Sequence, residues 1–266
     1  MVNPERATID GAFLDQALAL AREAADAAAK VIARHYRGGF AVEIKADLSP
    51  VTVADREAEA EIKRVLKSRY PEHGYYGEEL GRENTNSDFL WLIDPIDGTK
   101  SFVRRYPFYS TQIALMHRGE LVLGVSGAAH FCETAWARRG GGAFLNGERM
   151  RTGAAATVEE ASLSFGNLKS MACDERWLRF AGLVRHAWRT RGYGDFYHYH
   201  LLARGAVDAV IESDVNILDI AALVVILREA GAVFTDLDGA EVGLATTSVL
   251  AATPRLHPVL LAALRD

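Results

Sequence analysis

The sequence predicts an α/β protein in which helices and sheets are stacked in alternating layers and packed as two lobes. Three observations lead to this prediction. Two amphipathic helical segments come first, a strand-rich segment begins at residue 89, and short apolar runs alternate with helical segments after about residue 160. We expect one domain over residues 1–266, with lobes of about residues 1–155 and 156–266.

The two leading helices are predicted from apolar residues that recur at spacings of three and four. The first is expected over residues 11–36, where Leu14, Leu18 and Ile32 belong to the apolar series. The second follows the segment VTVAD and ends before Pro71, because proline does not continue a helix.

The middle of the chain is predicted to form strands joined by tight turns. Strands are expected at FLWLID, YSTQIALM, ELVLGVSGA and ETAWARR, with turns at residues 117–119 and 146–147. In the last third, strands are expected at SLSFG, AVDAVIES, AVFTD and SVLAAT. The segment LDIAALVVILREAG reads as a helix capped by Gly231.

Composition excludes several classes of protein. An apolar content of 49% supports a sizeable core, and a net charge of −5 with scattered basic residues argues against nucleic-acid binding. No leader-like N-terminus or membrane-length apolar run is visible, so we expect a cytoplasmic protein without a membrane partner. Cys132 and Cys173 form no CxxC motif, so any metal should be bound by oxygen.

The segment WLIDPIDGTKSF places Asp94 and Asp97 on either side of Pro95. Because Pro95 disfavours helical geometry at Asp94, we expect a tight turn before a helix begins at Gly98 and Thr99. Such a turn would direct two carboxylates and a carbonyl at one point, which suits Mg²⁺, and would offer amide groups to a phosphate oxygen. For two aspartates at this spacing alone, the commoner interpretation is that Asp94 ends a strand and Asp97 caps the following helix.

Further motifs decide between these interpretations. The chain also contains GEE at residues 77–79, KADLSPVTVAD at residues 45–55 and NILDIAA at residues 216–222. In this order and spacing, over about residues 10–260, the set resembles the inositol monophosphatase family of Mg²⁺-dependent, lithium-sensitive phosphatases. The resemblance implies the layered αβαβα sandwich shared with fructose-1,6-bisphosphatases, a small phosphate monoester substrate and a homodimer.

The resemblance also implies a site for two to three Mg²⁺ ions, with most of its ligands in the N-terminal lobe. Glu78, Asp94 and the carbonyl of Ile96 would hold the first ion. Asp94, Asp97 and Asp219 would hold the second, and Glu78 would contribute to a weaker third. The cations would then relieve the repulsion between the carboxylates.

Catalytic roles follow from the same resemblance. Glu78 and Thr99 would position and deprotonate an attacking water, and Asp55 would orient Thr99. The amides of Gly98 and Thr99 would hold the phosphoryl oxygens. The alternative for Asp55 is an acidic residue that favours the first turn of a helix.

Two other charged residues are less informative. Glu79 matches an acidic position that is not a ligand, so a loop carboxylate is the preferred interpretation. Lys45 matches a loop lysine near the metals, where a solvated lysine is almost equally plausible.

The segments ASLSFGN and RGYGDFYHYHLLARGAVD resemble the histidinol-phosphate phosphatase branch of the family. Asp195 and Glu212 are candidate anions for the ammonium and imidazole groups of histidinol phosphate. Asp195 could instead cap the helix that follows it. Leu218 replaces a tryptophan that many relatives have before the aspartate at position 219, which could reshape a pocket wall.

The predicted function is therefore a Mg²⁺-dependent histidinol-phosphate phosphatase, and an inositol-1-monophosphatase or another sugar or nucleotide phosphate phosphatase is the alternative. A non-catalytic relative would be expected to lack a metal ligand, and all are present. His198 and His200 point to different faces of their predicted helix, so we expect packing or surface residues there, not a metal site.

Overall fold

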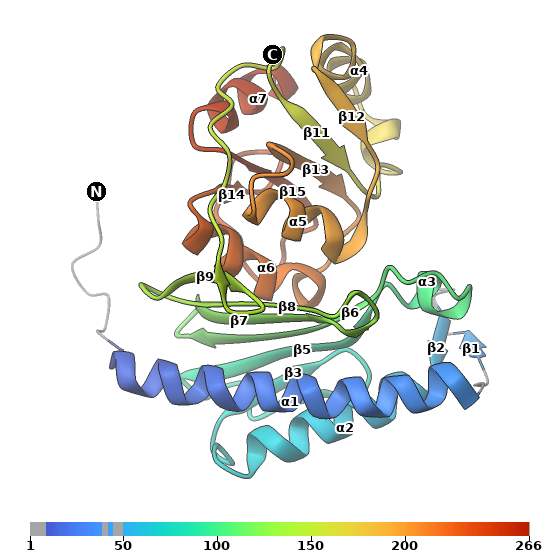
Figure 1. Ribbon diagram of the computed structural model, residues 1–266, viewed down its shortest axis with the longest axis vertical. Coiled ribbons are helices and arrows are strands. Elements are labelled where there is room, and N and C mark those ends of the chain that lie inside the picture. Colours follow the sequence, from blue (N-terminus) through green and yellow to red (C-terminus); the bar gives the residue numbers. More distant parts are fainter. Residues whose placement is uncertain (1–8, 39–41, 45–49, 266) are drawn as a thin grey trace.

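The computed structural model describes residues 9–38, 42–44 and 50–265. Its layers follow the order helix, sheet, helix, sheet, helix, which confirms the predicted αβαβα sandwich (Figure 1). From the first layer to the last, the helical layers contain α1 (Gly11–Gly38) and α2 (Val53–Lys67), then α5 (Asp195–Ala203) and α6 (Ile217–Ala230), and finally α4 (Arg176–His186) and α7 (Leu256–Arg265). Lys45 lies outside the described residues.

The first sheet has eight strands in the order β10-β9-β8-β7-β6-β5-β3-β4. In this sheet, as the structure describes it, β3 and β5 pair in parallel, and every other pair of adjacent strands is antiparallel. The strands, in chain order, are β3 (Gly74–Gly77), β4 (Gly81–Glu83), β5 (Phe89–Asp97), β6 (Ser110–His117), β7 (Glu120–Ala128), β8 (Glu133–Arg138), β9 (Gly142–Leu145) and β10 (Glu148–Arg149).

The second sheet has five strands in the order β12-β11-β13-β15-β14. They are β11 (Ser162–Phe165), β12 (Arg189–Arg191), β13 (Ala209–Ser213), β14 (Val233–Thr235) and β15 (Ser248–Ala252). The remaining elements are a ribbon of β1 (Val42–Ile44) and β2 (Pro50–Thr52), the short helix α3 (Thr99–Val103), and two 3₁₀ turns, η1 (Ala129–Phe131) and η2 (Met171–Cys173).

Apolar side chains fill every space between the layers. The alanine-rich face of α1 packs with α2 on the first sheet, and α4 and α7 pack on the second. Between the sheets, α6 is apolar around most of its circumference, because it contacts a sheet on each side. No helix in the described part of the chain has the length and apolarity needed to cross a bilayer.

Most predicted elements are confirmed, with one correction at the DPIDGT segment. The strand does not end at Asp94: β5 continues to Asp97, and its pairing with β6 shifts between these two residues. The reason is local. Pro95 has no N–H group for the ladder, and the amide of Ile96 donates to Asp94 Oδ1 at 3.0 Å. The expected turn is therefore a bulge inside the strand.

Candidate active site

A pocket of about 190 Å³ lies where β5 ends and where α3 and α6 begin. It gathers most of the residues predicted from the sequence, namely Glu78, Asp94, Ile96, Asp97, Gly98, Thr99, Asp195 and Asp219. Segments far apart in the chain therefore meet at one place. Asp55 and Glu212 do not line this pocket.

Three carboxylates form the centre of the pocket. Asp94, Asp97 and Asp219 each offer an oxygen, and these oxygens lie within 4.8 Å of one another. Asp94 and Asp97 come from the bulged end of β5, whereas Asp219 comes from the first turn of α6. The bulge is what lets two residues of one strand approach the same point.

Burial and mutual repulsion raise the pKa of these carboxyl groups. The pKa of Asp94 and that of Asp97 are well above their ordinary values, first because of burial and then because of neighbouring carboxylates. For Asp219, burial is the main cause that raises the pKa to about 7, and Glu78 adds to it. Ionising all of them requires a nearby positive charge, and an all-oxygen donor set suits a hard divalent cation such as Mg²⁺.

Glu78 reaches the pocket from the loop after β3. Its amide donates to the carbonyl of Ile93 at 3.1 Å, which continues the pairing with β5. Glu59 of α2 holds the next part of the loop, because its carboxylate accepts from the amides of Glu79 at 2.7 Å and Leu80 at 3.2 Å. The backbone approaches so closely that a side chain at Gly77 would collide with Glu59.

The hydroxyl of Thr99 lies between the end of β5 and α2. Its Oγ1 is 3.0 Å from the carbonyl oxygen of Ile96 and 3.4 Å from Asp55 Oδ1. Gly98 precedes it with a φ of 87°, and a Cβ there would lie 2.6 Å from the carbonyl oxygen of Phe108. Glycine is therefore required both by conformation and by space.

Asp55 and Asp219 occupy the same position in their helices. Each is the third residue of its helix and closes a capping box: Asp55 accepts from Thr52 N at 2.8 Å, and Asp219 accepts from Asn216 N at 2.9 Å. The structure is thus compatible both with Asp55 as an acidic residue in the first turn of a helix and with its predicted contact with Thr99. One oxygen of Asp55 serves the cap and the other faces the hydroxyl.

Comparison with known proteins identifies the relationship. The model of the inositol monophosphatase family matches residues 14–266. The chain belongs to this family. As a family member, it is a phosphatase of the class that hydrolyses small phosphate monoesters.

Individual relatives agree with this family assignment. A histidinol-phosphatase of Mycobacterium tuberculosis is 42% identical over 203 residues, which cover 74% of this chain and 78% of the relative. One from Streptomyces coelicolor is 38% identical, with 94% and 96% covered. The crystal structure of the SuhB protein of Bartonella henselae superposes with a TM-score of 0.87 at 27% identity, covering 94% of this chain and 99% of that one.

Within this inositol monophosphatase fold, Asp195 lines the pocket beside the carboxylate cluster, and its charge helps to raise the pKa of Asp97. The N-cap of α5 is Gly194, and Asp195 is the first helical residue with a φ of 45°. Its carboxylate accepts from Ser101 Oγ at 3.4 Å. The cap alternative for Asp195 is therefore wrong, because Gly194 occupies the N-cap position and Asp195 is already inside the helix. Burial and then Glu212 raise its pKa to about 6.

Glu212 lies behind the pocket wall. One oxygen accepts from the amide of Asn167 at 3.1 Å, and the other from the hydroxyl of Tyr199 at 2.7 Å and from His198 at 3.2 Å. Burial acts to raise its pKa, but these partners together hold the pKa below its ordinary value. Glu212 is thus an ionised group that contributes negative charge without reaching the cavity.

Three pocket residues were not predicted from the sequence: Lys100, Asn167 and Asp214. Lys100 directly follows DPIDGT, and Asn167 ends the segment ASLSFGN, so adjacency to a motif was the available signal. Asp214 lies in the loop between β13 and α6, where only the fold brings it to the pocket. His198 and His200 are fully buried, which confirms packing and excludes the surface alternative.

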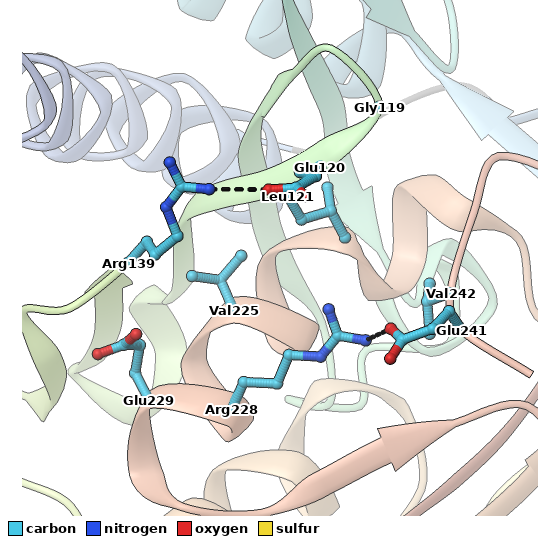
Figure 2. A pocket seen from close by; sticks show the side chains of 9 residues that line it. All are labelled: Gly119, Glu120, Leu121, Arg139, Val225, Arg228, Glu229, Glu241 and Val242. Carbon is cyan, nitrogen blue, oxygen red and sulfur yellow. Dashed lines mark hydrogen bonds and ion pairs between the residues drawn. The ribbon is translucent and has the colours of Figure 1, made fainter. Parts of the chain in front are cut away.

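A second, larger pocket of about 540 Å³ lies toward the other end of α6 (Figure 2). Its arginines are neutralised in pairs, with Arg139 2.8 Å from Glu120 and Arg228 2.6 Å from Glu241. Glu229 accepts hydrogen bonds from backbone amides instead of facing another carboxylate. This pocket has no converging oxygen donors, so size alone does not make it the candidate active site.

Proposed function

We propose that this phosphatase is a Mg²⁺-dependent histidinol-phosphatase, which hydrolyses L-histidinol phosphate to L-histidinol and phosphate. The observation that carries the metal dependence is the convergence of Asp94, Asp97 and Asp219 within 4.8 Å. The substrate is supported by relatives named histidinol-phosphatase at 42% and 38% identity. The acidic side chain of Asp195 in the pocket wall supports a substrate that carries a positive charge.

Asp94, Asp97, Asp219, Glu78 and the carbonyl of Ile96 would hold Mg²⁺, with Asp94 shared between ions. When bound, Mg²⁺ supplies a Lewis acid that acidifies water and offsets charge on the phosphoryl oxygens. The raised pKa of each aspartate fits this role. Without a cation, burial and repulsion between the carboxylates disfavour their ionised forms, whereas a bound cation would stabilise those forms.

The protein's own groups would then orient the reactants. Thr99 and Glu78 would hold the attacking water, the carboxylate of Glu78 would receive its proton, and Asp55 would fix the direction of the Thr99 hydroxyl. The amides of Gly98 and Thr99 would donate to the phosphoryl oxygens at the start of α3. No covalent intermediate on the enzyme is required.

Specificity would come from the negative charge of the pocket wall at Asp195. Histidinol phosphate carries an ammonium group and an imidazole, whereas inositol phosphate offers only hydroxyls. Asp195 would accept a charged hydrogen bond from the cationic part of the substrate, and Asp214 and the buried Glu212 would add negative potential. The hydroxyl groups of a polyol would not offset the free-energy cost of removing water from these carboxylates.

The test compares phosphate release from histidinol phosphate, inositol 1-phosphate and fructose 1,6-bisphosphate by the wild type and by Asp195→Asn. We expect histidinol phosphate to be the best substrate. The variant should lose about tenfold or more in kcat/KM for it, as expected for a charged hydrogen bond of about 1.5–3 kcal/mol. Activity on p-nitrophenyl phosphate should change little, because that ester has no amine.

The matched control is Ser101→Ala, which removes the neutral donor to Asp195 and keeps the carboxylate. It should retain the preference for histidinol phosphate. Equal losses by Asp195→Asn on both esters would make Asp195 a residue that shapes the pocket. A wild-type preference for inositol 1-phosphate would favour the alternative function.

A further inference from the structure

A buried chain of hydrogen bonds leads from Asp97 across β6 and β7 to His200 of α5. Ser110 Oγ lies 3.1 Å from Asp97 Oδ2, and Gln112 Nε2 lies 2.8 Å from Ser110 Oγ and 3.1 Å from Ser126 Oγ. Ser126 Oγ is 2.9 Å from His200 Nε2. The two serines, Gln112 and His200 are each at most 1% exposed.

Strand register places these groups in one line. Ser110 and Gln112 are two residues apart on β6 and therefore share a face of the sheet. Asp97 of β5 pairs with Ser110, and Ser126 of β7 pairs with Gln112. That face is covered mainly by α6, and His200 reaches Ser126 from the neighbouring helix α5.

The outer end of the chain is anchored by charge. His200 Nδ1 lies 3.1 Å from Glu133 Oε2, and Glu133 Oε1 lies 3.2 Å from Arg204 Nη1. The hydrogen bond from His200 is the main cause that lowers the pKa of Glu133, and burial lowers the pKa of His200. An ionised Glu133 only accepts, so the ring proton of neutral His200 is on Nδ1 and Nε2 is a bare acceptor.

This assignment fixes the direction of every other hydrogen bond. Ser126 must donate its hydroxyl proton to His200 Nε2, and Gln112 must donate one N–H to each serine. Ser110 then donates to Asp97 Oδ2. A flipped amide at Gln112 would take both hydroxyl protons, which would leave Asp97 Oδ2 and His200 Nε2 without donors.

We propose that Gln112, Ser126 and His200 are positioning residues for Asp97: acting through Ser110, they hold Oδ2 in one direction so that Oδ1 is presented to the pocket. The inference rests on the proposed function, because it takes Asp97 as a Mg²⁺ ligand. Neighbours of a metal ligand commonly set its orientation and basicity. Here the orientation of the Asp97 carboxylate would be fixed from the ion pair of Glu133 and Arg204, which lies outside the pocket.

The test measures Mg²⁺ binding by calorimetric titration of the full chain, and the Mg²⁺ concentration that gives half-maximal hydrolysis of histidinol phosphate. Gln112→Met keeps the side chain's length and removes both donors. We expect about tenfold weaker Mg²⁺ binding and a matching rise in the half-maximal concentration. At saturating Mg²⁺, kcat should recover to within about threefold of wild type, because Mg²⁺ itself then orients Asp97.

Ser110→Ala provides a second variant that deletes a single oxygen, and it should weaken Mg²⁺ binding in the same way. Thr235→Val is the matched control: it removes a buried hydrogen bond to His257 of 2.9 Å at the edge of the other sheet. It should lower the melting temperature and leave Mg²⁺ affinity unchanged.

The outcomes separate the inference from the function. If the wild type binds Mg²⁺ and hydrolyses the ester, and Gln112→Met and Ser110→Ala bind Mg²⁺ with wild-type affinity, the positioning role is overturned and the function stands. A wild type that neither binds Mg²⁺ nor hydrolyses the ester overturns both. Weakened Mg²⁺ binding in the control as well would reduce the effect to general destabilisation and reject the inference.

Discussion

The carboxyl group of Asp94 is buried, and three further carboxyl groups, those of Glu78, Asp97 and Asp219, act to raise its pKa. Burying a carboxylate among others is costly to the metal-free protein, and a bound cation would offset that cost. The amide of Ile96 occupies one of its oxygens and so fixes the orientation of the group.

Asp94→Asn should therefore separate stability from activity. The substitution removes one buried negative charge, so the metal-free variant should melt at a temperature equal to or higher than the wild type. Phosphatase activity should fall more than a hundredfold even at saturating Mg²⁺, a barrier increase of about 2.7 kcal/mol or more. Melting curves without metal and phosphate release with Mg²⁺ check both parts. Activity within about tenfold of wild type would contradict the shared-ligand role.

At the scale of single residues, the sequence was informative where a side chain belongs to a contiguous motif. Asp94, Asp97, Gly98 and Thr99 lie together in the chain and together in the pocket. Glu212 was misplaced by sequence reasoning, because its distance from Asp219 along the chain does not say which face of β13 it occupies. The hydrogen-bond partners that hold it away from the cavity come from the loop after β11 and from α5.

At the scale of elements, α2 contributes to the site without lining it. Its buried Glu59 holds the loop that carries Glu78, and Lys63 neutralises Glu59 at 3.0 Å one turn later. Lys63 also lies 3.3 Å from Glu83 of β4. This ion pair is therefore a support for the loop between β3 and β4.

Glu59→Met should destabilise the protein by about 3–5 kcal/mol, because it leaves Lys63 buried without its main partner. The double variant Glu59→Met/Lys63→Met should recover much of that loss, since it removes both charges. Its activity should remain at least about tenfold below wild type, because the amides of Glu79 and Leu80 still lack their acceptor. Urea unfolding and phosphate release measure the two effects. Full activity in the double variant would show that Glu59 has no role in placing Glu78.

The strand β3 also shows why some elements escape sequence prediction. Its sequence, Gly74–Gly77, has glycine at both ends and no alternation of apolar and polar residues. It becomes a strand because β5 and β4 pair with it on either side, and these contacts are not local. In contrast, the hairpin turn at Arg118 and Gly119, with φ of 48° and 84°, was predictable from its residues.

At the scale of the whole molecule, the acidic cluster couples Mg²⁺ binding to pH. The folded-state pKa of Asp219 is raised to about 7 and that of Asp195 to about 6, above their unfolded values. The folded metal-free protein therefore binds more protons than the unfolded chain between about pH 4 and pH 7. These groups then contribute stability at low pH that is lost as the pH rises through that window.

The increase in melting temperature caused by Mg²⁺ should accordingly be larger at pH 8 than at pH 5.5, because protons no longer compete with the cation. Taking the difference with and without Mg²⁺ cancels the titration of His73, whose pKa burial lowers to about 4, and of the other remote histidines. Asp219→Asn should flatten this dependence. A Mg²⁺ effect that is constant across the range would contradict the coupling.

The central position of α6 has a consequence for synthesis of the protein on the ribosome. The first sheet is complete once β10 has been made, but one of its faces is covered by α6, which ends at Ala230. At about 5–20 residues per second, the nascent chain exposes that apolar face for several seconds before its cover emerges. Chaperone binding during translation should therefore concentrate on chains whose emerged part ends between residues 150 and 230, and should decline once α6 has left the exit tunnel.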